Sequence, residues 1–335
     1  MNKSMSIIVL LFLLVVLPIS AVHAQVKIAQ TGFQFLSIIP DARAAAMGEA
    51  MTTVQGYSNS MFFNPAAMAR MNNSFDINLS QNNWIADIKH EAISLALSPS
   101  EGKYGVFGFS LLSVDYGKIQ GTMVWDNQQG YIDTEVFQPS ALAFGLGYAK
   151  ALSDRFSVGG HIKSTYQYLG KSVIPTSDTT NTVDKNFASA VAFDFGTIYL
   201  TGWKGLAFGM SVRNFSEEIK YQSEGFQLPL TFKIGISLEM SEWIKALPST
   251  QSFLLSIDAT HPRSYTERLN VGLEYKPISI LALRAGYLYN YDERNYTAGF
   301  GLKKKMGAGL LGIDYAYTPF GVFDNVQRMS IQLAF

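Results

Sequence analysis

The chain has 335 residues and no cysteine, and its 26 basic residues balance its 26 acidic ones. The absence of cysteine excludes disulfide scaffolds, thiolate metal sites and thiol nucleophiles. A net charge of zero, spread along the chain, gives no attraction to a nucleic-acid backbone, so nucleic acid is not expected as a partner. Charged residues make up 16% of the chain, and aromatic residues 13%. About 25% charged residues is usual for a soluble protein, so the composition predicts an apolar surface.

The first two dozen residues have the pattern of a secretory signal. Lys3 precedes an apolar run from Ile7 to Ile19, which is too short and too close to the N-terminus for a spanning helix. Val22 and Ala24 fit the minus-three and minus-one positions of a small-residue cleavage site. We therefore predict a signal peptide over residues 1–24 and export beyond the inner membrane, with an uncleaved anchor as the alternative.

The segment over residues 25–73 lacks a strand pattern. Residues 41–53 and 59–71 are rich in Ala and Met, and the second stretch contains Pro65. These features predict short helices or coil before the first strand. The segment is too long for a simple leader, so we expect it to fold into the lumen of the following domain as a plug.

From residue 74 onward, apolar residues alternate with small or polar ones. From Leu228 to Leu238 every second residue is apolar, whereas Lys233, Gly235 and Ser237 lie between them. Successive side chains of a strand point to opposite faces, so such a segment has one apolar and one polar or small face. The pattern predicts about 14 strands. They cover residues 74–80, 88–97, 104–114, 140–151, 156–168, 187–199, 205–215, 228–240, 252–260, 269–277, 280–291, 296–304, 310–317 and 326–335.

The connections between these strands differ at the two ends of the predicted sheet. The long connections 115–139 and 169–186 follow odd-numbered strands, whereas the tight turns 152–155 and 305–309 follow even-numbered ones. An even strand number with short turns at one end and long loops at the other is typical of bacterial outer-membrane barrels. The main departure is the connection 241–251, which is long for the short-turn end.

A large β-sandwich and a β-propeller also contain many short alternating strands. In these soluble folds the second face is rich in charged residues because it meets water. Here it is mostly Gly, Ala and Ser, which suits a crowded lumen, and aromatic residues such as Tyr287, Tyr289, Tyr315 and Tyr317 gather near strand ends. We therefore predict an all-β transmembrane fold over residues 74–335. It would be an antiparallel β-barrel in the outer membrane of a Gram-negative-type bacterium, surrounded by outer-membrane lipid.

Three strings stand out in the N-terminal segment: GFQFL over residues 32–36, PDARAAAMG over 40–48 and NPAAM over 64–68. Together they resemble the N-terminal signature of the PorV/PorQ family of outer-membrane proteins. The resemblance implies an architecture similar to the FadL fatty-acid transporters, with 14 strands and an N-terminal segment in the lumen. It also implies a role in type IX secretion. PorV-like members receive the C-terminal signal domains of secreted cargo, and PorQ-like members hold a surface attachment component.

The residues that match this signature are expected to be structural. The stretch 49–58 lacks the acidic run expected after it, and no string separates the PorV from the PorQ branch. A glycine allows close approach to the barrel wall, and an asparagine before proline favours a turn or a helix cap. We predict that the matching residues hold the plug rather than contact a ligand. They are Asp41, Arg43, Gly48, Asn64 and Pro65.

Ionisable residues on the lumen face form the candidate ligand site. Charges kept away from lipid must be paired or hydrated. They therefore predict either an ion-pair network across the lumen, which we favour, or a polar passage. In that passage Arg213 or Arg284 would bind the carboxylate of a fatty acid. The residues are His161, Lys163, Asp194, Arg213, Lys233, Glu239, Asp258, Glu274, Arg284 and Lys303.

Enzyme chemistry is not supported. The predicted mature chain has three histidines, His90, His161 and His261, and a catalytic triad needs one beside a nucleophile and an orienting carboxylate. No nucleophile elbow, phosphate loop or metal-ligand spacing is present in the sequence. We expect no catalytic activity, no cofactor and no metal.

The predicted function is therefore that of a non-enzymatic barrel acting in or beside type IX secretion, through protein partners. Exposed aromatic residues among polar ones favour binding, so Trp125, Tyr131 and Phe137, together with the loop 169–186, are the candidate contact surface. The alternative is FadL-like transport of hydrophobic solutes such as long-chain fatty acids, with a small hydrophobic molecule in the lumen.

Overall fold

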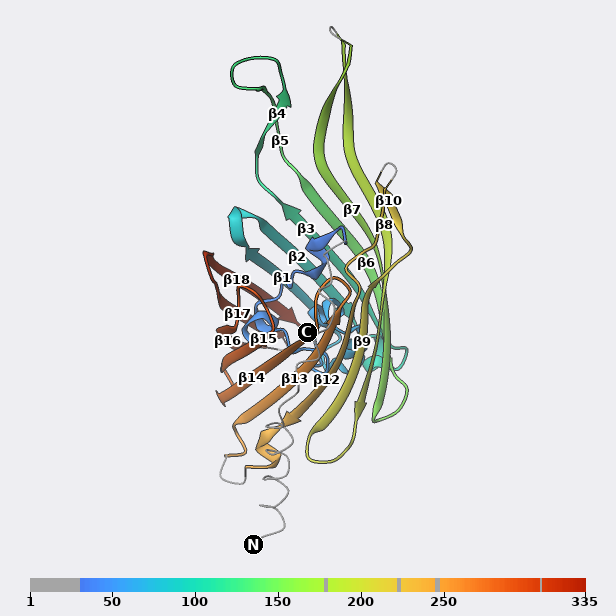
Figure 1. Ribbon diagram of the computed structural model, residues 1–335. Coiled ribbons are helices and arrows are strands. Elements are labelled where there is room, and N and C mark those ends of the chain that lie inside the picture. Colours follow the sequence, from blue (N-terminus) through green and yellow to red (C-terminus); the bar gives the residue numbers. More distant parts are fainter. Residues whose placement is uncertain (1–30, 178–179, 222–223, 245–247, 308) are drawn as a thin grey trace.

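The computed structural model describes residues 31–177, 180–221, 224–244, 248–307 and 309–335. The predicted signal peptide and the first residues of the plug segment lie outside the described residues. The wall of the molecule consists of antiparallel strands (Figure 1). They are β1 (Phe75–Asn83), β2 (Lys89–Leu97), β3 (Val106–Asp115), β6 (Ser140–Ala151), β7 (Phe156–Ser177), β8 (Thr180–Leu200), β9 (Leu206–Phe215), β12 (Thr231–Glu239), β13 (Ser252–Pro262), β14 (Arg268–Ile278), β15 (Leu281–Tyr289), β16 (Tyr296–Met306), β17 (Gly309–Phe320) and β18 (Phe323–Ala334).

These 14 strands close into one barrel, because β1 pairs with β2 on one side and with the last strand, β18, on the other. This confirms the predicted fold. Except at the outer ends of β7 and β8, each strand begins and ends within three residues of its predicted bounds. Every neighbouring pair of wall strands is hydrogen-bonded, so the described wall has no unpaired edge.

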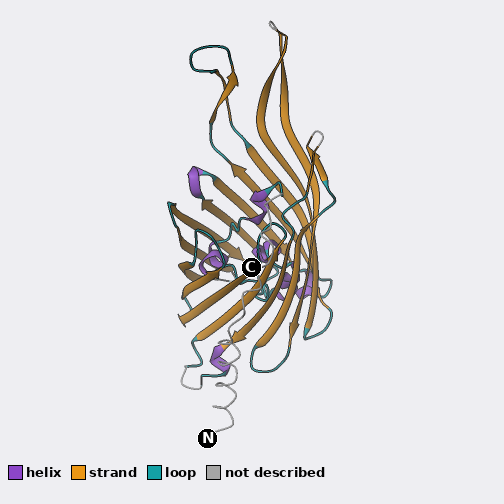
Figure 2. Cartoon of the chain, viewed as in Figure 1, coloured by secondary structure: helices purple, strands orange, loops and turns teal. Residues whose placement is uncertain are grey.

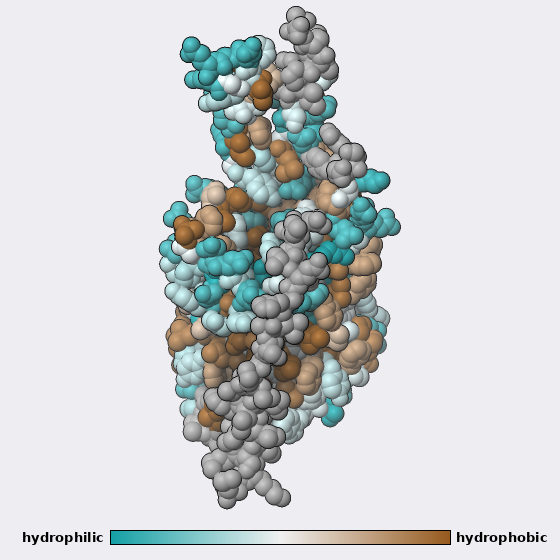
Figure 3. Space-filling view, viewed as in Figure 1, coloured by the Kyte–Doolittle hydropathy of each residue, from teal (hydrophilic) through white to brown (hydrophobic). Residues whose placement is uncertain are grey.

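The apolar face of the wall points outward, as the alternation predicts. On β12, Ile234 is 45% exposed and Ile236 is 42% exposed, whereas Lys233 and Ser237 on the other face are 4% and 6% exposed. Figure 3 shows apolar residues gathered on the barrel wall and mostly hydrophilic residues at the tip of the hairpin formed by residues 119–137. An apolar exterior on a closed barrel is the arrangement that a bilayer stabilises, because lipid solvates the side chains and the ladder satisfies the backbone.

Two predicted loops are instead strand hairpins that project from one end of the barrel. The connection 115–139 contains β4 (Ile119–Val124) and β5 (Tyr131–Phe137), and the connection 169–186 is taken up by the extended ends of β7 and β8. A third hairpin consists of β10 (Ile219–Tyr221) and β11 (Glu224–Phe226). Since outer-membrane barrels place their long connections outside the cell, we call this the outer end (Figure 1).

The described part of the N-terminal segment lies inside the barrel and contains short helices joined by coil (Figure 2). Glycine allows this segment to pass close to the wall. A Cβ on Gly48, whose φ is +59°, would lie 2.8 Å from the carbonyl oxygen of Val271. No helix in the described part of the chain is long and apolar enough to cross a membrane. The helices are η1 (Gln34–Ser37), α2 (Ala42–Ala46), η2 (Ser58–Phe62) and η3 (Pro65–Arg70) inside the barrel, and η4 (Ile85–Asp87), η5 (Pro99–Gly102) and η6 (Met240–Glu242) in connections.

Candidate functional site

A cavity of about 370 Å³ opens at the outer end of the lumen, between the plug and the barrel wall. This volume lies in the range of about 300–1,000 Å³ that is usual for small-molecule sites. We call it the mouth cavity. Five basic and three acidic side chains line it, together with aromatic and aliphatic ones. The charged residues are Arg213, Lys233, Arg263, Arg268, Arg294, Glu49, Asp292 and Glu293.

Two basic side chains form the floor of the mouth cavity. Arg213 is 6% exposed and donates from Nη2 to the carbonyl oxygen of Leu36 at 3.2 Å, while its Nε has no hydrogen-bond partner among the described residues. Lys233 donates from Nζ to the carbonyl oxygen of Glu49 at 3.1 Å. Its nearest carboxylate oxygen, Asp258 Oδ2, is 3.8 Å away and already accepts three hydrogen bonds from the plug. Both cations are therefore only weakly compensated.

A β-bulge in β9 directs two consecutive side chains into the lumen. The pairing of β8 with β9 shifts at this point, and both Arg213 and Asn214 are buried. Asn214 has a φ of +59°, a left-handed conformation that asparagine tolerates better than most residues. Its backbone N donates to Asp194 Oδ1 at 2.7 Å, and its Oδ1 accepts from Lys163 Nζ at 2.6 Å. The bulge therefore fixes the orientation of Arg213.

Below the floor, a polar cluster extends across β3, β7 and β8. His161 Nε2 lies 2.9 Å from Ser110 Oγ, and its Nδ1 lies 3.1 Å from Asp194 Oδ2. The ring fits because Gly145 of the intervening β6 has no side chain. The order serine, histidine, aspartate is that of a hydrolase triad. The serine is buried, however, and the adjacent cavity of about 20 Å³ is too small for a substrate. We therefore assign the cluster a structural role.

Arginines and aromatic rings alternate along the rim of the mouth cavity. The guanidinium of Arg268 lies 4.3 Å from the ring centre of Tyr265 and 4.2 Å from that of Tyr291. Arg294 lies 4.8 Å from the centre of Tyr291 and 5.9 Å from that of Trp84. Such cation–π contacts hold both partners in fixed positions. The rim is therefore a preformed surface that combines flat apolar faces with positive charge.

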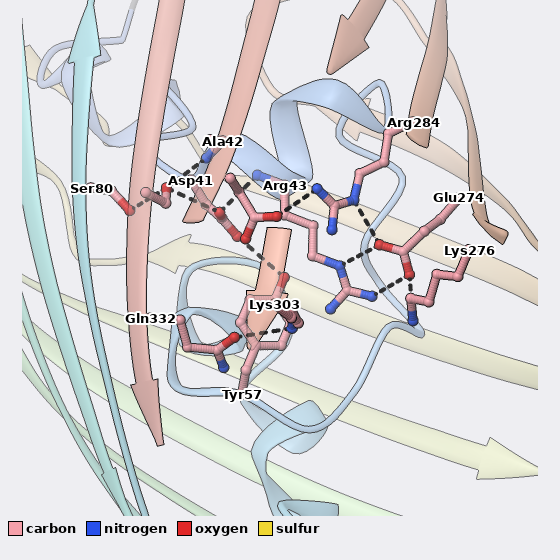
Figure 4. Close-up of polar contacts among 12 residues, drawn as sticks. Asp41, Ala42, Arg43, Tyr57, Ser80, Glu274, Lys276, Arg284, Lys303 and Gln332 are labelled. Atoms are coloured by element: carbon pink, nitrogen blue, oxygen red, sulfur yellow. Dashed lines mark hydrogen bonds and ion pairs between the residues drawn. The ribbon is translucent and has the colours of Figure 1, made fainter. Parts of the chain in front are cut away.

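The opposite side of the plug is attached to the wall by a group of buried ion pairs, which we call the ionic lock (Figure 4). Arg43 of α2 binds Glu274 of β14 through two bonds, Nε to Oε2 at 2.9 Å and Nη2 to Oε1 at 2.8 Å. Glu274 also accepts from Arg284 Nε at 2.7 Å and contacts Lys276 Nζ at 3.1 Å. Arg284 Nη1 in turn donates to Asp314 Oδ1 at 2.6 Å. The ionic lock thus connects the plug with β14, β15 and β17.

Asp41 orients the helix that carries Arg43. Its Oδ1 accepts from the backbone N of Arg43 at 3.0 Å as the N-cap of α2, and its Oδ2 accepts from Tyr57 Oη at 3.2 Å. Burial, together with the nearby carboxylate of Asp314, raises the pKa of Asp41 to about 6, although Arg43 opposes this shift. The pKa of the carboxyl group that caps the helix is therefore shifted towards neutral pH.

Two further signature residues, Asn64 and Pro65, lie where the plug meets the wall. Asn64 caps η3 by accepting from the backbone N of Ala66 at 3.1 Å, with Pro65 as the first residue of that helix. Its Nδ2 donates to the carbonyl oxygen of Thr52 at 2.7 Å. Gly196 of β8 makes room for this side chain, since a Cβ there would lie 1.8 Å from Asn64 Oδ1.

The predicted lumen residues do not form a single network. His161, Lys163 and Asp194 share the cluster below the floor, Arg213 and Lys233 form the floor itself, and Arg284 belongs to the ionic lock. Glu239 joins none of these groups. It lies at the inner end of β12, where its Oε1 accepts from Ser241 Oγ and from the backbone N of Phe253, each at 2.9 Å. The face alternation predicts orientation, but it carries no information on how far along the lumen a residue lies.

Several residues of the site were missed by the sequence analysis. The alternation places Asn214 outward, and only its type, asparagine next to an inward arginine, could have suggested a bulge. Glu49 and Arg294 form an ion pair of 2.5 Å between the plug and the β15–β16 loop, in segments without periodicity. Arg328 is buried against Trp84. Among the described residues, no group of three or more His, Asp or Glu side chains is placed to hold a metal ion.

The predicted contact surface lies on the β4–β5 hairpin. Trp125 and Tyr131 are exposed at its tip, whereas Phe137 is partly buried against Gly170 of β7. An ion pair of 2.9 Å between Glu135 and Lys171 also joins this hairpin to β7. The hairpin therefore rests on the extended strands beside it.

Barrel, exterior and plug together define a 14-stranded outer-membrane β-barrel of FadL-like architecture, and the chain belongs in the outer membrane of a Gram-negative-type cell. No protein-family model matches the sequence, and no curated protein matches it. Solved structures do resemble it in fold. The Ralstonia pickettii toluene transporter TbuX is 11% identical with a TM-score of 0.58, over 88% of this chain and 98% of that one.

Two further solved structures have the same fold. The Pseudomonas putida toluene transporter TodX is 12% identical with a TM-score of 0.56, over 92% of this chain and 98% of that one. A FadL homologue from Pseudomonas aeruginosa is 11% identical with a TM-score of 0.50, over 93% of this chain and 99% of that one. At such identities the likeness establishes the fold. Membership of the PorV/PorQ family stays a prediction.

Proposed function

We propose that this barrel lets small hydrophobic solutes cross the outer membrane, entering at the mouth cavity and passing between the plug and the wall. The mouth cavity is the observation that carries the proposal, because it opens at the outer end and lies against the plug. The likeness in fold to barrels described as toluene transporters supports the same function.

The contacts of the plug favour one side of the lumen for the passage. Towards β2, β6 and β8 the wall presents small apolar side chains, and the plug meets them with bulky apolar ones such as Leu36 and Phe62. The small second cavity lies there and shares Ile38 and Arg213 with the mouth cavity. The ionic lock lies on the opposite side of the barrel. The wall alanines are Ala92, Ala141, Ala143, Ala188 and Ala192.

Obstruction of this side tests the proposal. Ala143→Trp places a large ring in the lumen, whereas Phe144→Trp changes the next residue of β6, which is 42% exposed on the lipid face. We expect Ala143→Trp to abolish uptake of labelled toluene by intact cells that make the protein, and Phe144→Trp to leave uptake unchanged. Altered migration of unheated samples in gels would verify that both barrels fold.

Two results would contradict this function. Cells that make the wild-type protein would take up toluene no faster than cells without it, or the folded Ala143→Trp variant would transport as well as Phe144→Trp. The first result removes hydrophobic solutes as cargo, and the second removes the passage along β6.

Protein partners in or beside type IX secretion are a second candidate function, supported by the PorV/PorQ-like strings and the projecting hairpins. Trp125 and Tyr131 are 47% and 45% exposed on the β4–β5 hairpin. Replacement of residues 119–137 by a short turn leaves the wall strands intact and removes these side chains. If the hairpin binds secretion components, secreted surface proteins should be lost while toluene uptake persists. Normal secretion by both this variant and a gene deletion would rule the candidate out.

A further inference from the structure

The floor of the mouth cavity holds more positive charge than its neighbours neutralise. Asp194 is the nearest acid below Arg213, but its oxygens already bind Lys163 at 2.8 Å, His161 and the backbone of Asn214. No carboxylate lies within ion-pair distance of Arg213 among the described residues. A buried guanidinium without an anionic partner is unfavourable, so this position favours an anion from outside the chain.

The two floor cations come from adjacent strands. Arg213 of β9 pairs with Thr231 of β12, so Lys233 is its diagonal neighbour on the same face. Two like charges this close repel each other in a site shielded from water. One carboxylate bound between them would relieve that repulsion.

The acids near the cavity do not fill this role. Glu49 is engaged with Arg294 through its Oε1 at 2.5 Å, and its contact with Lys233 is made by the backbone oxygen. Burial would raise the pKa of Glu49, but the positive charges of Arg294 and Lys233 outweigh this effect and lower the pKa. The carboxylate is therefore ionised and paired with Arg294. Asp292 and Glu293 line the cavity from the β15–β16 loop, where they disfavour a second negative group on a ligand.

The rest of the cavity suits a compact apolar body. Flat rings and aliphatic side chains line it above the floor, and the passage below narrows to the cavity of about 20 Å³. A cavity of about 370 Å³ at this position has room for one ring or a short chain. The apolar lining residues are Ile38, Trp84, Pro229, Leu230, Tyr265, Tyr291 and Phe320.

We propose that the mouth cavity selects small amphipathic monocarboxylates, with the carboxylate bound by Arg213 and Lys233 and the apolar body against the aromatic rim. This rests on the proposed transport function and names its preferred substrate class. The bulge of β9 is the device that creates this preference, because it holds the guanidinium at the end of the entry path.

Calorimetric titration of the full-length protein in detergent tests the proposal with two probes of equal shape, benzoate and its neutral analogue benzamide. We expect the wild type to bind benzoate at least about tenfold more tightly, since hydrogen bonds to charged groups contribute more than neutral ones. Arg213→Met should reduce the ratio of affinities to about one. Arg213→Lys should restore part of it, and Arg155→Met, at the exposed inner end of the barrel, should behave as wild type.

Equal affinities of the wild type for both probes, or binding of neither, would overturn the inference. So would a folded Arg213→Met variant that keeps the preference for benzoate. Should that variant fail to fold, the inference is tested by the ratio of benzoate to benzamide affinity in Lys233→Met and in the wild type. Toluene uptake is measured separately, so a failure here with uptake intact removes the charge preference and leaves the transport function standing.

Discussion

Removal of Arg43 from the ionic lock should loosen the plug without opening the barrel. In Arg43→Met the bidentate pair is lost, but Glu274 keeps Arg284 at 2.7 Å and Lys276 at 3.1 Å. The remaining carboxylate is still compensated, so we expect a loss of about 1.5–3 kcal/mol in plug docking. Glu274→Met instead leaves two buried guanidinium groups without this partner, for which about 3–5 kcal/mol is expected. Plug opening should therefore increase about 10-fold to 150-fold in the first variant and further in the second.

Native-state hydrogen exchange of the plug amides measures this opening directly. The backbone N of Met47 is a suitable probe because it bonds within α2. Lys171→Met is the matched control. Its partner Glu135 is 51% exposed, and pairs of this kind contribute at most about 1 kcal/mol. If Arg43→Met and Lys171→Met exchange alike, or if Glu274→Met has the smaller effect, the ionic lock does not hold the plug.

Three further expectations concern the plug and the wall. Gly48→Ala should weaken docking by about 1–3 kcal/mol more than Gly56→Ala in the same exchange experiment. Both glycines have a positive φ that strains an alanine, but only at Gly48 does the Cβ meet backbone of the wall, whereas at Gly56 nothing lies nearer than 3.8 Å. Asp41 has its pKa raised from 3.8 to about 6 by burial and by Asp314. The docked state therefore binds more protons, and docking should weaken by up to about 3 kcal/mol as pH rises through this window, a slope absent in Asp41→Asn. Asp194→Asn leaves buried cations behind and should lower barrel stability by about 3–5 kcal/mol, seen as an earlier denaturant midpoint.

The part of the fold that contacts lipid could be predicted from the sequence, and the part outside the membrane could not. Within the bilayer one face of each strand meets acyl chains and the other the lumen, so alternation marks β12 from Thr231 to Glu239. Beyond the membrane both faces of a strand meet water. The outer parts of β7 and β8 therefore lose the alternation, and residues 169–186 looked like a loop although the ladder continues through them.

The candidate site was predictable in orientation but not in partnership. The alternation of apolar and polar residues along a strand places Arg213 and Glu274 on the lumen face, whichever residues they pair with on the neighbouring strands. The pair Arg43–Glu274, in contrast, joins residues 231 positions apart, and no local pattern encodes such a contact. The bulge at Asn214 turns this side chain into the lumen, although the alternation of β9 predicts that it points outward. The bulge that orients Arg213 could therefore not be predicted from the alternation.

The uneven attachment of the plug gives a physical reason for the proposed path. A bidentate pair such as Arg43–Glu274 forms in one geometry only, so the ionic lock fixes the position of the plug relative to the wall. Apolar side chains of the same volume would give similar stability but would not fix this position. On the side of β6 the contacts of Leu36 and Phe62 have no such direction. A hydrophobic solute can replace them with contacts of the same kind, at little change in buried apolar area, while the ionic lock stays closed. A charged solute gains nothing there. Under the proposal above, its carboxylate is bound at the floor of the mouth cavity, so Arg213 would be the residue that sorts solutes by charge.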